Sequence, residues 1–212
     1  MPNSRRAFFK TGAVAIAGGA AVSAAPVAKA GPLQVTPACA GHETPPALDG
    51  PLFKPSSPER TNLITPSVRG VRLDLRGVVY SPQCATISGA LLDFWQCDQN
   101  GDYDTVGFGL RGHQRTNGKG EYHLNTIIPR DYFGQWGWRA PHIHVQIQAP
   151  DGPPLITQLY FPDDTQAYGR DFAALNAGDE FINRICTIQV ARAGAGYRGT
   201  FDFVIKTTVG AP

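Results

Sequence analysis

The sequence contains two histidines separated by one residue, in the stretch RAPHIHVQIQA that covers residues 139–149. His142 and His144 alternate with apolar residues, as expected of a β-strand, in which positions i and i+2 share a face. Two neutral imidazoles held side by side form one edge of a metal site. The same pattern also fits two hydrogen-bonded histidines on a solvated strand face. Other residues must therefore decide between the two interpretations.

Four further side chains could complete such a site. Tyr103 follows the Asn-Gly turn of DQNGDYD, and Tyr132 lies in the segment IIPRDYFG. Arg139 stands three residues before His142, and Gln158 lies in the strand-like segment LITQLYF. Taken one at a time, the tyrosines are ordinary turn and strand aromatics, the arginine a surface cation and the glutamine a polar strand residue. Their combination with the histidine pair indicates a functional site.

Short strands must position these residues. The sequence contains 24 glycines and 18 prolines, and apolar residues alternate with polar ones in several short segments. The strand-like segments are 71–80, 89–97, 115–128, 142–149, 154–161, 185–193 and 199–206. The Asn-Gly pair in RTNGKGEYHLNTII predicts a hairpin-like turn, and only 171–184 offers a short helical stretch. This pattern predicts an all-β fold, a single β-sandwich of mixed or antiparallel strands over residues 69–212.

The first 30 residues are expected to be a targeting segment outside the fold. SRRAFFK contains the paired Arg5 and Arg6, a small apolar run follows, and AKA ends at Ala30 in a small-x-small cleavage site. This order is typical of a twin-arginine signal cleaved after Ala30, which predicts export to the periplasm or the extracellular space. An uncleaved anchor is the alternative. Residues 31–68 are rich in proline and lack periodicity, which predicts an extended arm docked on the domain.

Charge and cysteine content narrow the function classes. The formal net charge is +2, but residues 1–30 hold four basic residues and no acid. The remainder has 15 basic and 17 acidic residues, so we expect no nucleic-acid partner and no membrane association after cleavage. The four cysteines permit up to two disulfides in an exported protein, in any of three pairings, and buried free thiols are the alternative. They are Cys39, Cys84, Cys97 and Cys186.

The order of these motifs resembles the intradiol ring-cleaving dioxygenases, the family of protocatechuate 3,4-dioxygenase and catechol 1,2-dioxygenase. The family pattern has a strand ending in Trp, a Gly-then-Tyr turn, an Arg-Gly block, a Thr-x-x-x-Gly turn, a Pro…Tyr segment and Arg-Pro-x-His-Ile-His. This sequence has DFWQCDQNGDYD, LRGHQRTNGKGEYHLNTIIPRDY and RAPHIHVQI in that order. It departs from the family pattern in two places. The link from Tyr132 to Arg139 is short, and Ala and Pro before His142 stand in the reverse of the usual order. The similarity covers about residues 43–205.

The resemblance implies one ferric ion per chain. Two phenolates are hard anionic donors that favour Fe(III) over Fe(II), and the metal deprotonates a tyrosine whose unperturbed pKa is about 10. The resemblance implies four metal ligands, Tyr103, Tyr132, His142 and His144. It further implies that Tyr132 takes up a substrate proton, that Arg139 stabilises negative charge developing on the ring and that Gln158 borders the oxygen pocket.

The implied activity uses O2 to cleave a catechol-type ring between its two hydroxylated carbons, giving a cis,cis-muconate-type diacid. The partners would be a catechol and O2, and the resemblance leaves a homo-oligomer open. Two other functions fit the histidine pair: a metal-free sandwich module that binds small aromatics or sugars, and a zinc hydrolase, which needs a third His, Cys or carboxylate ligand. Trp136 and Trp138 are expected to be pocket or core aromatics, and His113 and His123 framework or surface residues.

Overall fold

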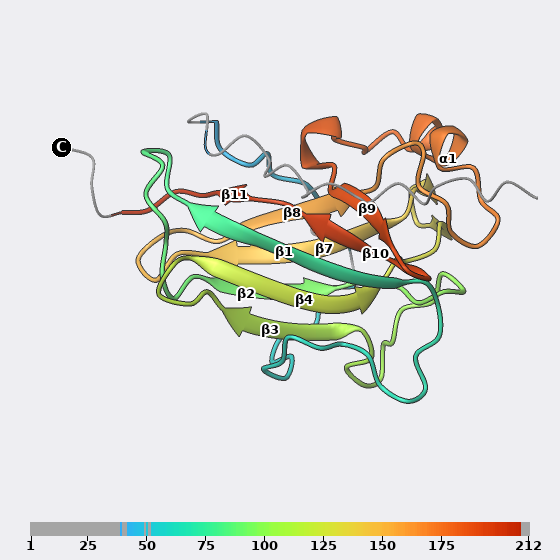
Figure 1. Ribbon diagram of the computed structural model, residues 1–212, viewed down its shortest axis with the longest axis horizontal. Helices are drawn as coiled ribbons and strands as arrows, with labels where there is room; N and C mark the ends of the chain where they lie inside the picture. Colours follow the sequence, from blue (N-terminus) through green and yellow to red (C-terminus); the bar gives the residue numbers. More distant parts are fainter. Residues whose placement is uncertain (1–38, 40–41, 49, 51, 209–212) are drawn as a thin grey trace, which may run out of the picture.

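Two open β-sheets packed face to face form the body of the molecule, confirming the all-β sandwich (Figure 1). The computed structural model describes residues 39, 42–48, 50 and 52–208. One sheet contains β1 (Arg72–Tyr80), β4 (Glu121–Ile127), β9 (Gln189–Ala193), β10 (Gly196–Thr200) and β11 (Phe203–Val204). The other has the order β3 (Arg111–Arg115), β2 (Leu91–Trp95), β7 (His142–Gln148), β8 (Leu155–Tyr160). A separate hairpin pairs β5 (Tyr132–Gly134) with β6 (Gly137–Arg139).

Strand alternation sorts the side chains into core and outer faces. Leu73 and Leu75 of β1 are buried, and the ring of Phe94 in β2 meets that of Tyr122 in β4 across the two layers. In β7 the apolar residues, including Ile143, join the same core. Because neighbouring positions on a strand point to opposite faces, the alternate residues of β7 and β2 project from the outer face of the four-stranded sheet.

The connection between β3 and β4 differs from the hairpin expected around its Asn-Gly pair. β3 pairs with β2, whereas β4 pairs antiparallel with β1, so this turn carries the chain from one sheet to the other. The segment expected as one strand at 199–206 is divided between β10 and β11, both parallel to β1. Asp202 lies at the break and accepts a hydrogen bond from the Val78 N–H at 2.8 Å.

The helical stretch expected at 171–184 contains one short helix and one 3-10 turn. The helix α1 (Phe172–Gly178) begins after Asp171, whose side chain accepts a hydrogen bond from Ala174 N, and η1 spans Arg184–Cys186. Figure 1 shows α1 at one end of the sandwich. Among the described residues, no helix is long and apolar enough to cross a membrane.

The described part of the arm runs along both edges of the four-stranded sheet. Ala47 N donates to Ile156 O of the edge strand β8, and Arg60 N donates to His113 O of the opposite edge strand β3. These bonds pair edge groups that would otherwise be exposed. Between these two points the chain passes over the outer face, where a Cβ on Gly50 would lie 3.5 Å from His144 Cε1.

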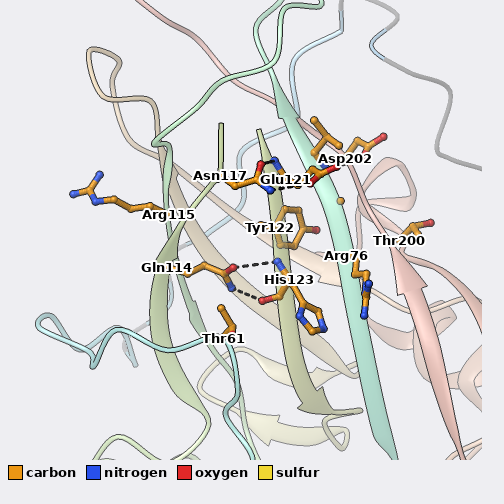
Figure 2. Close-up of a pocket in the computed structure, with 12 residues that line it drawn as sticks. Thr61, Arg76, Gln114, Arg115, Asn117, Glu121, Tyr122, His123, Thr200 and Asp202 are labelled. Atoms are coloured by element: carbon orange, nitrogen blue, oxygen red, sulfur yellow. Dashed lines mark hydrogen bonds between the residues drawn. The ribbon is translucent and has the colours of Figure 1, made fainter. Parts of the chain in front are cut away.

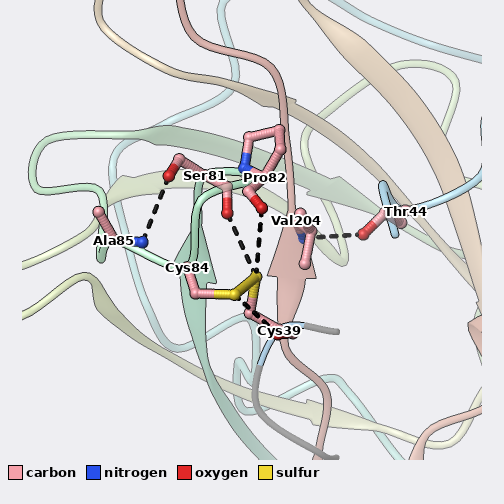
Figure 3. The surroundings of a disulfide bond; sticks show 7 residues. All are labelled: Cys39, Thr44, Ser81, Pro82, Cys84, Ala85 and Val204. Carbon is pink, nitrogen blue, oxygen red and sulfur yellow. Dashed lines mark hydrogen bonds between the residues drawn. A yellow bond between two sulfur atoms is a disulfide. The ribbon is translucent and has the colours of Figure 1, made fainter. Parts of the chain in front are cut away.

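A disulfide joins Cys39 to Cys84, in the loop that follows β1 (Figure 3). It links positions 45 residues apart and so ties the arm to the five-stranded sheet. Cys97 and Cys186 are buried free thiols. One of the two disulfides that the cysteine count permits is therefore present, in a pairing that the sequence left open, and the other two cysteines are the buried free thiols of the alternative.

Candidate active site

Strand pairing aligns the polar residues of the outer face in two rows. In the antiparallel register His144 lies opposite Trp95 of β2 on one side and Gln158 of β8 on the other. His142 lies opposite Tyr160. All five side chains are nearly fully buried, so the histidines do not occupy the solvated strand face that was the alternative interpretation. The Trp95 ring stacks on His144 at a centroid distance of 4.8 Å and fixes the plane of the imidazole.

A tight loop after β2 brings Tyr103 to this face. Asp98 Oδ1 accepts hydrogen bonds from the N–H groups of Asn100 and Asp102, which closes the turn that the Asn-Gly pair predicted. Gly101 has φ +94°, and a Cβ there would lie 3.1 Å from Tyr132 Cβ. A glycine at this position therefore lets the loop pack directly against the segment that carries Tyr132.

The β5–β6 hairpin positions two site residues at once. Tyr132 and Arg139 are paired opposite each other at its open end, and Arg139 is three residues before His142. A Cβ on Gly134 would lie 2.9 Å from the Tyr132 ring, so the hairpin backbone packs on that ring. The short link between Tyr132 and Arg139, a departure from the family pattern, is thus a two-stranded ribbon that the sequence did not lead us to expect.

The rings of the four predicted ligands contact one another in a closed loop, which we call the ligand circuit. Ring centroids are 5.5 Å apart for Tyr103 and Tyr132, 5.7 Å for Tyr132 and His142, 4.7 Å for His142 and His144, and 6.2 Å for His144 and Tyr103. His142 Nε2 and His144 Nε2 face each other at 3.1 Å. Two nitrogens bound to one ion at about 2.1 Å and at a right angle would lie about 3 Å apart.

Hydrogen bonding and burial set the protonation of these groups. His142 Nδ1 lies 2.7 Å from Ala140 O, which can only accept a hydrogen bond, so Nδ1 carries the proton and Nε2 presents its lone pair. Burial, followed by the Arg139 charge, lowers the pKa of His142 to about 4. Burial, followed by His142, also lowers the pKa of His144 well below its usual range. Both imidazoles are therefore neutral, the form that binds metals.

Burial has the opposite effect on the phenols. It raises the pKa of Tyr103 well above the usual tyrosine value, and it raises the pKa of Tyr132 as well. Tyr103 Oη is buried and has no hydrogen-bond partner of ordinary geometry in the described part of the chain. An unsatisfied buried oxygen costs about 1–3 kcal/mol, and a cation bound there would remove that cost by ionising the phenol.

The donor set fits a ferric ion better than zinc. It offers two phenol oxygens and two neutral imidazoles, and hard anionic oxygen donors suit a trivalent metal. Within the described residues, no group of three or more His, Cys, Asp or Glu side chains is arranged to hold a metal ion. The third ligand that a zinc hydrolase would require beside the histidine pair is thus missing from this region.

Arg139 and Gln158 meet beside the ligands in one buried network. Arg139 Nη2 donates to Gln158 Oε1 and, at 3.3 Å, to the hydroxyl of Tyr160. The Tyr160 hydroxyl donates to the same glutamine oxygen at 2.7 Å, and Gln158 Nε2 donates to Leu48 O of the arm. Asp179, which follows α1, holds the other side of the guanidinium. Arg139 is therefore a buried, fully oriented cation and not the surface residue that it would be in isolation.

Sequence reasoning missed three residues of this site. Tyr160 could have been found only with the strand register, which places it opposite His142. Trp95 stands in the family motif, but its place opposite His144 also needs the register. Asp179 lies 40 positions after Arg139, and nothing in the local pattern links the two.

Trp136 and Trp138 are not core residues. They are 45% and 58% exposed, because they lie on the turn and the outward face of the β5–β6 hairpin. Trp136 contacts Phe181, whose ring covers Arg139, at 6.2 Å between ring centroids, so a place at the edge of a pocket stays a prediction. His113 and His123 are framework residues as expected: His113 Nδ1 lies 3.2 Å from Ser57 Oγ, and His123 pairs with Asp74.

A surface groove lies on the five-stranded sheet and is separate from the ligand circuit. Figure 2 shows this groove, of about 520 Å³, between β4, β1 and the end of β3. Some of its polar groups bond to each other. Gln114 exchanges two hydrogen bonds with the backbone of His123, and Asn117 Nδ2 donates to Glu121. None of the four predicted ligands lines it.

Known proteins with similar sequences and structures are ring-cleaving dioxygenases. The dioxygenase family model matches residues 48–207. Chlorocatechol 1,2-dioxygenase from Rhodococcus opacus is 31% identical over an alignment of 150 positions that covers 58% of each chain. Catechol 1,2-dioxygenase 2 from Acinetobacter lwoffii is 28% identical and matches 61% of this chain and 55% of its own. The chain thus spans little more than half the length of these relatives.

A solved structure covers the sandwich more completely. It is the dioxygenase domain of a dioxygenase–carbohydrate-binding protein fusion from Streptomyces sp. SirexAA-E, with 44% identity and a TM-score of 0.69. The match covers 79% of this chain and 100% of that domain. Since the family model spans most of the chain and the four ligand positions of the family motif come together in space, the chain belongs to the intradiol dioxygenase family.

Proposed function

We propose that this protein is a non-haem, Fe(III)-dependent intradiol dioxygenase that uses O2 to cleave a catechol between its two hydroxylated carbons. The observation that carries the proposal is the closed circuit of two phenols and two neutral imidazoles beside a buried arginine. The relatives named as catechol and chlorocatechol dioxygenases support a catechol-type substrate. The product would be a cis,cis-muconate-type diacid.

The metal would be held by Tyr103, Tyr132, His142 and His144. When bound there, a ferric ion would supply Lewis acidity and an electron acceptor for the substrate's oxygens. The two histidines are pre-oriented, one by Ala140 O and one by the stacked Trp95 ring. Because these supports come from the sheet itself, the imidazole lone pairs are fixed before any ligand enters.

The remaining roles follow from the burial of the hydroxyls and from charge. Both tyrosines are half-buried as residues, but the Tyr132 hydroxyl is less deeply buried than that of Tyr103, so Tyr132 Oη is the phenol oxygen better placed to accept a proton from an entering substrate. Arg139 is a fully buried cation, which strengthens its attraction to negative charge that develops on the substrate ring. Gln158 lies across from His144 and holds the arginine and the arm together at the edge of the pocket.

The direct test is purification of the iron-loaded protein with metal analysis, visible absorption and O2 uptake on a panel of catechols. We expect about one iron per chain, a red-brown colour from phenolate-to-iron charge transfer, and a ring-opened diacid that contains both atoms of labelled O2. A colourless protein that binds catechols without consuming O2 would support a binding module instead. An active preparation with stoichiometric zinc and no iron would overturn the proposal.

We also propose that the protein is exported through the twin-arginine route and cleaved after Ala30. The supporting sequence lies outside the described residues, and the Cys39–Cys84 disulfide is consistent with an oxidising compartment. Replacing both arginines (Arg5→Lys with Arg6→Lys) should leave uncleaved precursor in the cytoplasm, as measured by cell fractionation. Unchanged export of the double variant would contradict the assignment.

A further inference from the structure

Asp179 is a fully buried carboxylate that faces the site arginine. Its side chain is 0% exposed, and its two oxygens lie 3.2 and 3.1 Å from Arg139 Nε. Asp179 Oδ2 also accepts a hydrogen bond from Ala140 N at 2.8 Å, and Oδ1 accepts one from Phe181 N at 2.9 Å. A buried carboxylate with this many donors has its position and its rotamer determined by the protein.

The helix α1 delivers this carboxylate to the site. Asp179 is the residue at which the helix ends. The helix is attached to the segment that follows β8, because buried Asn176 donates to Phe161 O at 2.9 Å and to Asp163 Oδ1 at 2.7 Å. The buried ring of Phe172 packs against Phe161 at 6.2 Å between centroids. The attachment of α1 to the chain that leaves β8 therefore sets where Asp179 lies.

The contacts around Arg139 divide its guanidinium into a held part and an available part. Nε is held by Asp179, Nη2 by Gln158 and Tyr160, and the Phe181 ring covers one face at 5.1 Å from Cζ. In the described part of the chain, Arg139 Nη1 donates no hydrogen bond. The guanidinium is therefore fixed on two sides and keeps one nitrogen for another partner.

We propose that Asp179 is a positioning residue, which locks the Arg139 guanidinium so that Nη1 is presented to the bound catechol. The inference rests on the proposed function, because it assigns a purpose to the orientation of a residue in that site. Asp179 itself touches no substrate. Removing its charge should free the guanidinium to rotate, and a misplacement of about 1 Å in a positioned group can cost about a hundredfold in turnover.

Asp179→Asn is the first variant, because it keeps the size of the side chain and an amide oxygen while removing the charge. In the iron-loaded enzyme we expect the iron content and the charge-transfer absorption of the wild type. We expect kcat to fall about a hundredfold and KM to change little, since the loss lies in orientation for the reaction. The matched control is Asp163→Asn, which removes a carboxylate charge beside the same helix, keeps an amide oxygen that can accept from Asn176 and does not touch Arg139. That control should keep wild-type kcat.

A second experiment separates positioning from support of the fold. In Arg139→Ala, added guanidinium ion at millimolar concentration should restore part of the lost turnover, because Asp179 can seat the free cation. In the double variant Arg139→Ala with Asp179→Asn, the same guanidinium should restore none. The double variant removes both buried charges and so leaves no unpaired charge in the interior. The comparison of guanidinium rescue with and without Asp179 therefore remains usable even if Asp179→Asn alone does not fold.

The outcomes separate this inference from the proposed function. A wild-type protein that carries iron but never consumes O2 with any catechol overturns both. An active wild type with wild-type kcat in Asp179→Asn overturns the positioning role alone. Equal guanidinium rescue with and without Asp179 also overturns it, and so does an Asp163→Asn variant as impaired as Asp179→Asn.

Discussion

The two tyrosines of the site differ in how deeply their hydroxyls are buried, and this difference separates their roles. Both are half-buried as residues, but Tyr103 Oη is buried without a hydrogen bond of ordinary geometry, whereas Tyr132 lies on the open end of a two-stranded ribbon and its hydroxyl is less deeply buried. A phenol with an enclosed hydroxyl is suited to remain a constant ligand. A phenol at the mouth can exchange its partner and receive a proton when substrate enters.

Single Phe substitutions test this division. In the iron-loaded protein Tyr132→Phe should keep iron and part of the charge-transfer absorption, because Tyr103 still supplies a phenolate. Its catechol complex should form more slowly but show a nearly wild-type spectrum, whereas Tyr103→Phe should alter the catechol-bound spectrum. Anaerobic titration with catechol, followed by visible absorption, measures both. The opposite pattern would reverse the two roles, and unchanged resting spectra in both variants would remove these residues from the ligand set.

At this scale the sequence predicted individual residues better than their partners. The His-x-His spacing places both imidazoles on one strand face by geometry alone, and the ordered motifs brought the two tyrosines and Arg139 into the prediction. The carboxylate that orients Arg139 comes from the end of a distant helix. The ring that stacks on His144 comes from a neighbouring strand. Such pairs depend on strand register and helix docking, which have no local sequence signal.

At the scale of elements, the Thr-x-x-x-Gly motif explains how the chain changes sheets after β3. Thr116 Oγ1 donates to Ile87 O at 2.7 Å and accepts from Ala90 N at 2.9 Å, which fixes the start of the turn. Gly120 ends it with φ +76° and accepts a hydrogen bond from Val79 N of β1. The turn chemistry was readable in the sequence. Its interpretation as a hairpin was wrong, because the local pattern cannot specify which sheet the next strand joins.

Two glycines of this turn provide a matched test. Gly120→Ala should lower the free energy of unfolding by about 2 kcal/mol, since its left-handed backbone is strained for alanine and a Cβ would lie 3.0 Å from Thr86 Cβ and 3.1 Å from Val79 O. Gly118→Ala, two residues earlier, meets nothing within 4 Å and should leave stability nearly unchanged. Urea unfolding measures both. Equal losses would show that the turn does not depend on the conformation of Gly120.

At the scale of the whole molecule, the arm covers sheet edges and the site, and the sandwich supplies the backbone partners that hold the arm in place. The arm pairs with both edge strands of the four-stranded sheet and passes the site near Gly50, so the sheet edges and the ligand circuit are covered by the same segment. The disulfide between Cys39 and Cys84 fastens this arm to the five-stranded sheet. The sequence showed that the arm lacks periodic structure, but its path depends on backbone groups of distant strands and could not be read from its own residues.

The buried thiols test how tightly the whole molecule is closed. Cys97 and Cys186 are both buried, and burial raises the pKa of the Cys97 thiol to about 12 and also raises that of Cys186. Since only the thiolate reacts, raising the pH to 9 should produce about 0.1% of reactive Cys97, and burial further blocks access to it. A thiol-specific disulfide reagent should therefore label none of the four cysteines in the native protein between pH 7 and pH 9.

The control is the same labelling in denaturant. Labelling should rise to two sites there, and to four in denaturant with prior reduction, because the disulfide protects Cys39 and Cys84. Rapid native labelling of two sites would mean that the sandwich opens readily at these thiols, whereas four sites in denaturant without reduction would mean that the disulfide does not form.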